Sequence, residues 1–171
     1  RVSSLNRDVT TGLFRRQIAE ERLKPIAQSK IGVTLAMIDL NDLHLVNNTL
    51  GHDRGDDFIK LAARRLGKLQ RRHGGYRISL SRWGVGDEFL LICEGLYDPH
   101  ELCIEIEEAL HAKHPITGRW GLGVAGVARS RHGETRVVKE CADTAMYRAK
   151  REYHKNGNSR ILMYDYVFDG L

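Results

Sequence analysis

The chain has 171 residues, a formal net charge of +5, and 29% charged against 42% hydrophobic residues. This length suits one domain with a substantial core and is short for two, so we expect a single domain over residues 1–171. No run approaches the roughly 18 consecutive apolar residues of a membrane-spanning helix, and the start, RVSSLNRD, lacks a secretory signal pattern. The composition therefore predicts a soluble domain without membrane contact. Because it begins with Arg, we also expect it to be the C-terminal output domain of a longer protein.

The cysteines and the basic residues narrow the class of protein further. Cys93, Cys103 and Cys141 are odd in number and form no Cys-x-x-Cys pair, which argues against a disulfide framework or a zinc ribbon and predicts a cytoplasmic location. The basic stretch RRLGKLQRR (residues 64–72) could attract phosphate, but no aromatic residues lie among its cations. We interpret it as a solvated helix face near the helix C-terminus and expect no nucleic-acid partner.

Hydrophobic spacing in the first half of the chain predicts helices that alternate with one buried strand. Apolar residues three or four apart indicate helix, and a short continuous apolar run indicates a buried strand. The expected elements, in chain order, are a helix from Thr10 or Thr11 to about Pro25, a strand over 31–40, a short helix over 41–50, a tight turn over 51–57 and a helix from about Asp56 to Arg72.

The second half contains a predicted hairpin. YRISLSRW alternates apolar with polar residues, and EFLLICEG follows it across a Gly-Val-Gly-Asp turn. The expected elements are strands over 76–83 and 88–95, a helix over 98–113, a Gly-rich strand over 120–129, a helix over 135–155 and a strand over 160–168. Because the hairpin is antiparallel, we expect an α+β fold, an α/β sandwich in which a mostly antiparallel central sheet is flanked by helices.

Three acids fall at strand ends. Asp39 closes the first strand, and Asp87 with Glu88 forms the tip of the hairpin. If the two elements are neighbours in one sheet, the carboxylates repel each other and have raised pKa values unless a cation lies among them. A hard divalent ion, Mg²⁺ above all, suits such oxygen ligands and would bind nucleotide phosphates. The alternative is that Asp87 and Glu88 are only turn residues and Asp39 only a strand-end cap.

Between these acids lies a candidate base-recognition pair. Asn47 precedes a glycine-containing turn and Asp56 follows it. An Asn amide offers a donor and an acceptor, and a carboxylate accepts two N–H groups, a combination that matches the edge of guanine. Adenine would leave the carboxylate unpaired. The alternative is that Asn47 is an ordinary helix residue and Asp56 a helix N-cap.

Four motifs resemble those of the GGDEF domain family of diguanylate cyclases, in the order that the family has them. DVTTGL (residues 8–13) resembles the family's opening motif, and MIDLNDLHLVNNTLGHDRGDDF (37–58) resembles its first acidic block in unbroken register. RWGVGDEF (82–89) resembles the signature, and CADTAMYRAK (141–150) the late helix motif. The resemblance covers nearly the whole chain.

The resemblance implies a polymerase-palm-like sheet and an activity. Family members join two GTP molecules into cyclic di-GMP and release pyrophosphate, with one GTP on each protomer, so that a homodimer is required. Asp39, Asp87 and the backbone carbonyl of Leu40 match the ligands of Mg²⁺, which Mn²⁺ could replace. Glu88 matches a further ligand or proton acceptor, which makes Asp87 and Glu88 the catalytic pair. An upstream sensor domain is expected to drive the activity.

The same resemblance assigns the substrate-binding residues. Asn47 and Asp56 match the residues that recognise guanine, in agreement with the hydrogen-bonding argument, and Lys150 matches a lysine that grips phosphate. Gly84 and Gly86 stand in the signature, where glycine lets backbone approach phosphate closely.

The chain departs from the family pattern at three places. Val85 interrupts the signature, either as an insertion absorbed in a bulge, which we favour, or as a replacement of the first glycine. His44 stands where the family usually has a phosphate-contacting Lys. Asn158 aligns with a phosphate-gripping Arg, for which Lys155 or Arg160 could substitute.

Two hypotheses of function follow. The first is a Mg²⁺-dependent diguanylate cyclase active as a homodimer, which the retained acids Asp39, Asp87 and Glu88 favour. The second is a degenerate domain that binds GTP without turnover and serves as a regulatory or dimerising module. The departures at His44, Val85 and Asn158 favour the second.

Overall fold

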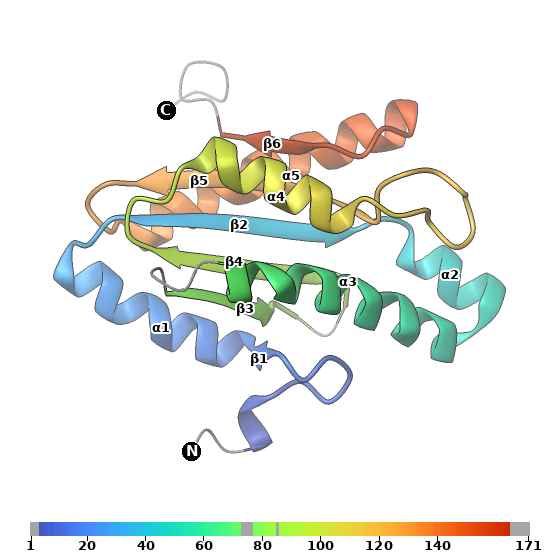
Figure 1. Cartoon of the computed structure of the whole chain (residues 1–171), viewed down its shortest axis with the longest axis horizontal. Coiled ribbons are helices and arrows are strands. Elements are labelled where there is room, and N and C mark those ends of the chain that lie inside the picture. The colour runs from blue at the N-terminus through green and yellow to red at the C-terminus, as the bar shows by residue number, and fades with distance from the viewer. Residues whose placement is uncertain (1–3, 73–76, 85, 165–171) are drawn as a thin grey trace.

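A six-stranded sheet with helices on both faces forms the fold (Figure 1). The structure, a computed structural model, describes residues 4–72, 77–84 and 86–164. The strands are β1 (Phe14–Arg15), β2 (Val33–Leu40), β3 (Ile78–Arg82), β4 (Glu88–Glu94), β5 (Gly123–Ser130) and β6 (Ile161–Met163). The helices are the 3₁₀ turn η1 (Ser4–Asn6), α1 (Arg16–Ser29), α2 (Leu43–Leu50), α3 (His52–Arg72), α4 (Pro99–Leu110) and α5 (Thr135–Asn156).

The sheet is antiparallel at its centre and parallel at its edges. Its strand order is β1-β3-β4-β2-β5-β6. Strand β2 pairs antiparallel with both β4 and β5, and β3 forms the predicted hairpin with β4. Among the strands of the described residues, only the outer pairs, β1 with β3 and β5 with β6, are parallel. The predicted α+β class with a mostly antiparallel central sheet is confirmed.

Burial on both faces explains why the sequence of β2 is a continuous apolar run. Every residue of β2 is buried, because helices cover both faces of the sheet. Ala36 and Ile38 face the core shared with α2, α3 and α4, whereas Leu35 and Met37 face the core shared with α1 and α5. In Figure 1, α3 and α4 lie in front of the sheet and α5 behind it. A strand covered on both sides loses the apolar–polar alternation of a half-exposed one.

The first helix differs from its predicted bounds at both ends. It begins at Arg16 rather than at Thr10 or Thr11, because Phe14 and Arg15 extend to pair with β3. It also continues past Pro25 to Ser29. Pro25 is on the exposed side of the helix, where water can satisfy the carbonyl that loses its amide partner.

The expected turn over residues 51–57 is also wrong. Helix α3 begins at His52, so that Gly51 alone separates it from α2. Gly51 has φ +90°, a conformation that only glycine adopts without strain, and this lets two helices meet at a sharp corner. Asp56 therefore lies inside α3 and is not its N-cap.

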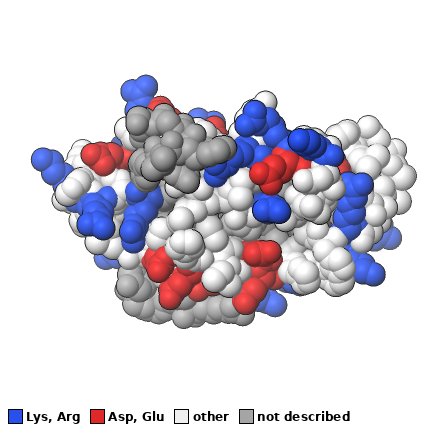
Figure 2. All heavy atoms as spheres, turned by 90° about the horizontal axis from the view of Figure 1, so that it is seen from above, with Lys and Arg blue, Asp and Glu red and all other residues white. Residues whose placement is uncertain are grey.

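The basic stretch on α3 has a structural use at one position. The Arg65 guanidinium donates to the carbonyls of Ala109 and His111 at the C-terminal end of α4, where helix carbonyls lack intrahelical partners. On the face shown in Figure 2, Lys and Arg side chains are interspersed with Asp and Glu. The absence of a nucleic-acid partner stays a prediction. In the part of the chain that the structure describes, no helix is both long and apolar enough to cross a bilayer.

A largely buried ion pair ties the N-terminal segment to the turn of the hairpin. Arg82 Nη1 donates to both carboxylate oxygens of Asp8, at 2.9 and 3.0 Å. The same guanidinium donates from Nε and Nη2 to the Gly86 carbonyl, at 3.2 and 3.0 Å. Thr11 donates to Asp8 from its amide and its hydroxyl. Burial alone would raise the pKa of Asp8, but the hydrogen bonds from Thr11 and the Arg82 guanidinium outweigh it and lower this pKa.

We expect Asp8→Asn to lower the free energy of unfolding by about 2–3 kcal/mol at pH 7, because it leaves the Arg82 charge buried without its partner. The pKa of Asp8 is depressed in the folded protein, so this stabilisation is present above about pH 4 and is lost as the pH falls through the folded pKa. Urea unfolding of both proteins between pH 7 and pH 2.5 should show the difference shrinking.

The matched control is Asp57→Asn, which breaks the exposed pair of Asp57 with Arg54. Its cost should stay below about 0.5 kcal/mol. Equal effects of the two substitutions would contradict a structural role for the Asp8–Arg82 pair.

Candidate active site

The three predicted acids meet at one end of the central strands. Asp39 on β2 and Glu88 on β4 are direct cross-strand partners. The amide of Leu40 donates to the Asp87 carbonyl at 2.9 Å, which places Asp87 beside the end of β2. The antiparallel pairing of β2 with β4 thus brings together residues that lie about fifty positions apart.

Asp39 has the most unusual environment of the three. It is only 3% exposed, and its Oδ2 accepts a hydrogen bond from Lys150 Nζ at 2.9 Å. Burial and the neighbouring Asp87 raise the pKa of Asp39 to about 6, although Lys150 acts in the opposite direction. Burial and the charges of Asp87 and Asp143 also raise the pKa of Glu88. The cluster therefore has an excess of negative charge that Lys150 compensates only in part.

This donor set fits a metal ion that arrives with a nucleotide. Among the described residues, no three His, Cys, Asp or Glu side chains converge closely enough to hold a metal by themselves. Mg²⁺ in nucleotide sites typically takes one or two carboxylates and completes its octahedron with phosphate oxygens and water. Buried Asp39 with Asp87 beside it supplies that partial set.

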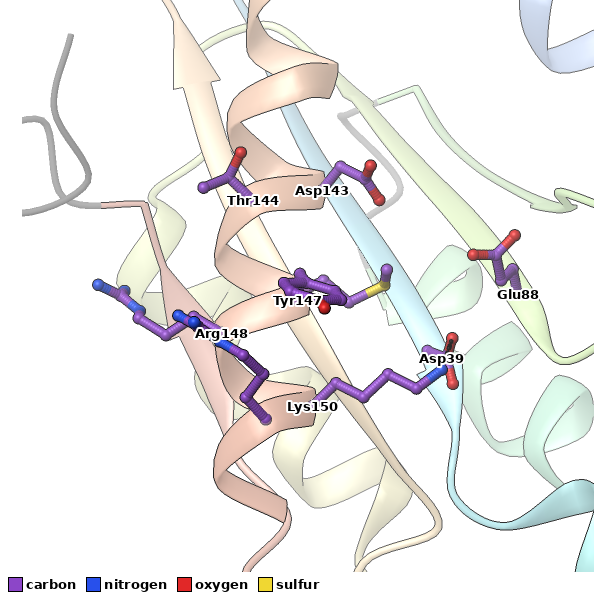
Figure 3. A pocket seen from close by; sticks show the side chains of 9 residues that line it. Asp39, Glu88, Asp143, Thr144, Tyr147, Arg148 and Lys150 are labelled. Carbon is purple, nitrogen blue, oxygen red and sulfur yellow. Dashed lines mark hydrogen bonds and ion pairs between the residues drawn. The ribbon is translucent and has the colours of Figure 1, made fainter. Parts of the chain in front are cut away.

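A pocket of about 540 Å³ opens beside the acids. Its walls are Asp39, Glu88 and seven residues of α5, which are Asp143, Thr144, Met146, Tyr147, Arg148, Lys150 and Arg151. Figure 3 shows Lys150 reaching from α5 to Asp39, with Glu88 beyond it on the neighbouring strand. The pocket has the size of a small-molecule site, and its lining carries both signs of charge, as a metal–phosphate complex requires.

The predicted guanine-recognition pair lies at the corner between α2 and α3. The Asn47 amide covers Gly55, so closely that a Cβ at Gly55 would collide with its Oδ1. Asp56 follows Gly55 and is exposed, whereas Asn47 is partly buried. Because Gly55 has no side chain, the Asn47 amide can lie against this part of α3, next to Asp56. His44 is exposed on α2, and none of these three side chains lines the pocket beside the acids.

The signature turn is only partly described, because Val85 lies outside the described residues. Strand β3 keeps a regular register up to Arg82, which pairs with Phe89. A Cβ at Gly86 would meet no described atom within 4 Å, and one at Gly84 only the Gly86 nitrogen, at 3.9 Å. The described atoms therefore leave open the space beside both glycines that a side chain would occupy. Whether Val85 is an insertion or a replacement stays open.

Sequence reasoning missed two further cations that line the pocket beside Lys150. Neither Lys155 nor Arg160 lines it, and Arg160 pairs with Glu152 at 3.4 Å. Arg148 and Arg151 line it instead, and Arg151 lies one turn beyond Tyr147. The sequence contained a signal for Arg151, because it follows Tyr147 by four residues and such residues share one face of a helix.

Sequence reasoning also missed a buried histidine that braces the turn after β2. His114 is 2% exposed, and its Nε2 lies 2.8 Å from the Asn41 carbonyl. Its Nδ1 accepts hydrogen bonds from two backbone amides, so that Nε2 carries the proton and donates to Asn41. The next residue, Asp42, accepts from the Tyr153 hydroxyl at 2.6 Å. These contacts fix the turn that presents the Leu40 carbonyl.

Comparisons with known proteins agree with this arrangement. The family model described as "Diguanylate cyclase, GGDEF domain" matches residues 5–156. The diguanylate cyclase DgcZ of Escherichia coli (strain K12) is 31% identical over 170 residues, which cover 94% of this chain and 54% of DgcZ. The cyclic di-GMP phosphodiesterase PdeB of Shewanella oneidensis is 36% identical over 90 residues, 52% of this chain and 10% of PdeB. The chain thus spans at most about half of either relative.

Solved structures show the same fold. The GGDEF domain of DgcB from Caulobacter crescentus, in complex with c-di-GMP, matches with a TM-score of 0.77 at 24% identity, over 96% of both chains. The diguanylate cyclase SiaD of Pseudomonas aeruginosa, in complex with its activator SiaC, matches with a TM-score of 0.73 at 26% identity, over 94% of this chain and 62% of SiaD. With a family match over most of its length, and with the family's motif residues gathered at one end of its sheet, this chain belongs to the GGDEF domain family.

Proposed function

We propose that this domain is a diguanylate cyclase. It condenses two GTP molecules into cyclic di-GMP with release of pyrophosphate, depends on Mg²⁺, for which Mn²⁺ could substitute, and acts as a homodimer. An upstream sensor domain controls it in the cytoplasm. The observation that carries the proposal is the burial of Asp39 beside Asp87 and Glu88, with Lys150 as partial compensation. A domain that only dimerised would have no use for this unfavourable cluster.

The described side chains support distinct roles in this reaction. Asp39, Asp87 and the Leu40 carbonyl would hold the metal ion, which when bound neutralises phosphate charge and polarises the α-phosphate. Lys150, which donates to Asp39 in the ligand-free domain, would contact the same phosphates. The raised pKa of Glu88 makes it a better proton acceptor for the attacking 3′-hydroxyl. Asn47 and Asp56 would select guanine by their combined donor and acceptor pattern.

A second candidate is a GTP-binding regulatory module without turnover. Two exposed residues favour it, His44 on α2 at the position of a family lysine and Asn158 at the position of a family arginine, because each replaces a side chain that would bind phosphate. The presence of a similar segment in PdeB, a protein named as a phosphodiesterase, is compatible with this candidate.

The proposal predicts that the purified domain at high concentration, with GTP and Mg²⁺, forms pyrophosphate and cyclic di-GMP in a two-to-one ratio. Asp87→Ala should lower the rate by roughly 100-fold or more, since loss of even an outer partner of a metal site costs about 10–100-fold. Asp57→Ala, which removes an exposed acid of α3, should leave the rate unchanged.

Chromatographic quantification of both products measures these rates. Clear GTP binding without product, repeated with dimers enforced by a fused coiled coil, would favour the regulatory module instead.

A second prediction concerns pH and metal. The pKa of Asp39 is raised from 3.8 to about 6 on folding, so ionisation of this group destabilises the metal-free protein as the pH rises above about 4, by about 3 kcal/mol in full. In the metal-free protein, Asp39→Asn should therefore raise the free energy of unfolding by about 1–3 kcal/mol at pH 7.5. It should change this free energy little at pH 4. Mg²⁺ with GTP should raise the melting temperature of the unmodified protein but not that of the variant. A variant less stable than the unmodified protein at pH 7.5 would contradict the assignment.

The third prediction uses two glycines of the same helix. Gly55→Ala should displace the Asn47 amide and weaken GTP binding by roughly tenfold, the equivalent of about one hydrogen bond. A Cβ at Gly67 would meet no described atom within 4 Å, so Gly67→Ala should only stabilise α3, by about 0.5–1 kcal/mol. Calorimetry with GTP and with ATP measures both variants. If Gly55→Ala binds GTP like Gly67→Ala, Asn47 does not recognise the base.

A further inference from the structure

The loop between α4 and β5 places an arginine against the end of α5. This loop, residues 111–122, arches at the same end of the sheet as α2 and the last turn of α5 (Figure 1). The Arg119 guanidinium lies over Gly157, so closely that a Cβ at Gly157 would collide with Arg119 Nη1. Gly157 has φ +76°, a conformation that glycine adopts without strain, and the chain turns beneath the guanidinium at this point.

Hydrogen bonds attach both the loop and the end of α5 to the turn after β2. The Asn41 side-chain amide donates to the Gly121 carbonyl at 3.2 Å, two residues beyond Arg119. The Tyr153 hydroxyl on α5 donates to Asp42 at 2.6 Å. Burial and this hydrogen bond raise the pKa of Tyr153 to about 12, whereas the charge of Arg119 and a hydrogen bond with it act in the opposite direction. The Arg119 guanidinium therefore lies beside the Tyr153 hydroxyl, close to the turn after β2.

Arg119 is exposed, and no Asp or Glu side chain among the described residues forms an ion pair with it. Other cations at this end of the sheet differ, because Lys150 pairs with Asp39 and Arg160 with Glu152. A guanidinium offers several N–H donors in a planar fork that matches phosphate oxygens. An arginine that packing holds in place, and that no carboxylate neutralises, is therefore suited to bind a phosphate group.

The distance of Arg119 from the acids suits the far end of a triphosphate. Lys150 donates to Asp39, and it precedes Tyr153 by three residues and Gly157 by seven. An α-helix rises roughly 1.5 Å per residue, so the guanidinium lies about 5–10 Å beyond Lys150 along the direction of α5. A chain of phosphates that begins at a metal ion beside Asp39 can extend over that length.

We propose that Arg119 binds the terminal phosphate of the nucleotide and so selects a triphosphate over a monophosphate. The inference rests on the proposed function, which places GTP at the Asp39 cluster. Asn158, at the position of a family arginine, follows Gly157 directly. An arginine from a distant loop thus lies beside the place that the end of α5 leaves without a cation. The departure at Asn158 then no longer favours a domain without turnover.

The ratio of two affinities tests the proposal. Calorimetry with Mg²⁺ measures the binding of GTP and of GMP to the unmodified chain and to Arg119→Gln. The variant should bind GTP at least roughly tenfold more weakly and GMP equally well, because GMP lacks the terminal phosphate. Arg119→Lys retains the charge without the planar fork and should recover part of the loss. Arg136→Gln, which breaks the exposed pair with Glu140 near the start of α5, is the control and should change neither affinity.

A second variant moves the guanidinium without removing its charge. Gly157→Ala puts a Cβ where Arg119 Nη1 lies, so it should also lower the affinity for GTP relative to GMP. Gly118→Ala is its control, because Gly118 has φ +65° and a Cβ there would meet no described atom within 4 Å. This control introduces the same backbone strain into the loop and should leave the ratio of the two affinities unchanged.

The outcomes separate this proposal from the proposed function. A purely structural role of Arg119 would lower the melting temperature and weaken GTP and GMP binding equally, so an unchanged ratio in Arg119→Gln overturns the proposal. If the unmodified chain and Arg119→Gln bind GTP equally tightly, the proposal fails and the proposed function stands. If the unmodified chain binds neither nucleotide, both fail.

Discussion

The buried carboxylate of Asp39 is the feature on which the site depends. It lies at the end of the central strand, where pairing on both sides excludes water, and its pKa of about 6 leaves it ionised at neutral pH. Lys150 is its hydrogen-bonding partner, while Asp87 and Glu88 add further negative charge. The folded domain therefore holds a region of negative potential that a cation relieves, and α5 and the hairpin supply the charged groups around it.

Two turns present the groups around this carboxylate, and distant segments brace both. After β2, the chain is held by His114 from the loop before β5 and by Tyr153 from α5. On the other side, Asp8 holds Arg82, which in turn holds the Gly86 carbonyl of the signature turn. Groups fixed in this way before a ligand arrives need little reorganisation on binding, which is how preorganised sites gain their effect.

Helix and strand types were predictable where a local period decides them, as in β2 and in the hairpin of β3 with β4. The ends of helices were not predictable where a distant partner decides them. Pairing of Phe14 with Ser81 moves the start of α1, and Gly51 lets α3 begin several residues before Asp56. In the site, Asp39, Asp87, Glu88 and Lys150 were predictable from motifs, whereas Arg148 and Arg151 came to light only with the pocket.

The sequence by itself determined the family, the order of the elements and the chemical types gathered for a nucleotide and a metal ion. These properties follow from spacing and residue type along the chain. Only the tertiary structure decided that Asp39 is buried with a raised pKa, that Asn47 lies over Gly55, and that His114 donates to Asn41. Burial and long-range hydrogen bonds depend on which segments pack together, and no local pattern encodes that packing.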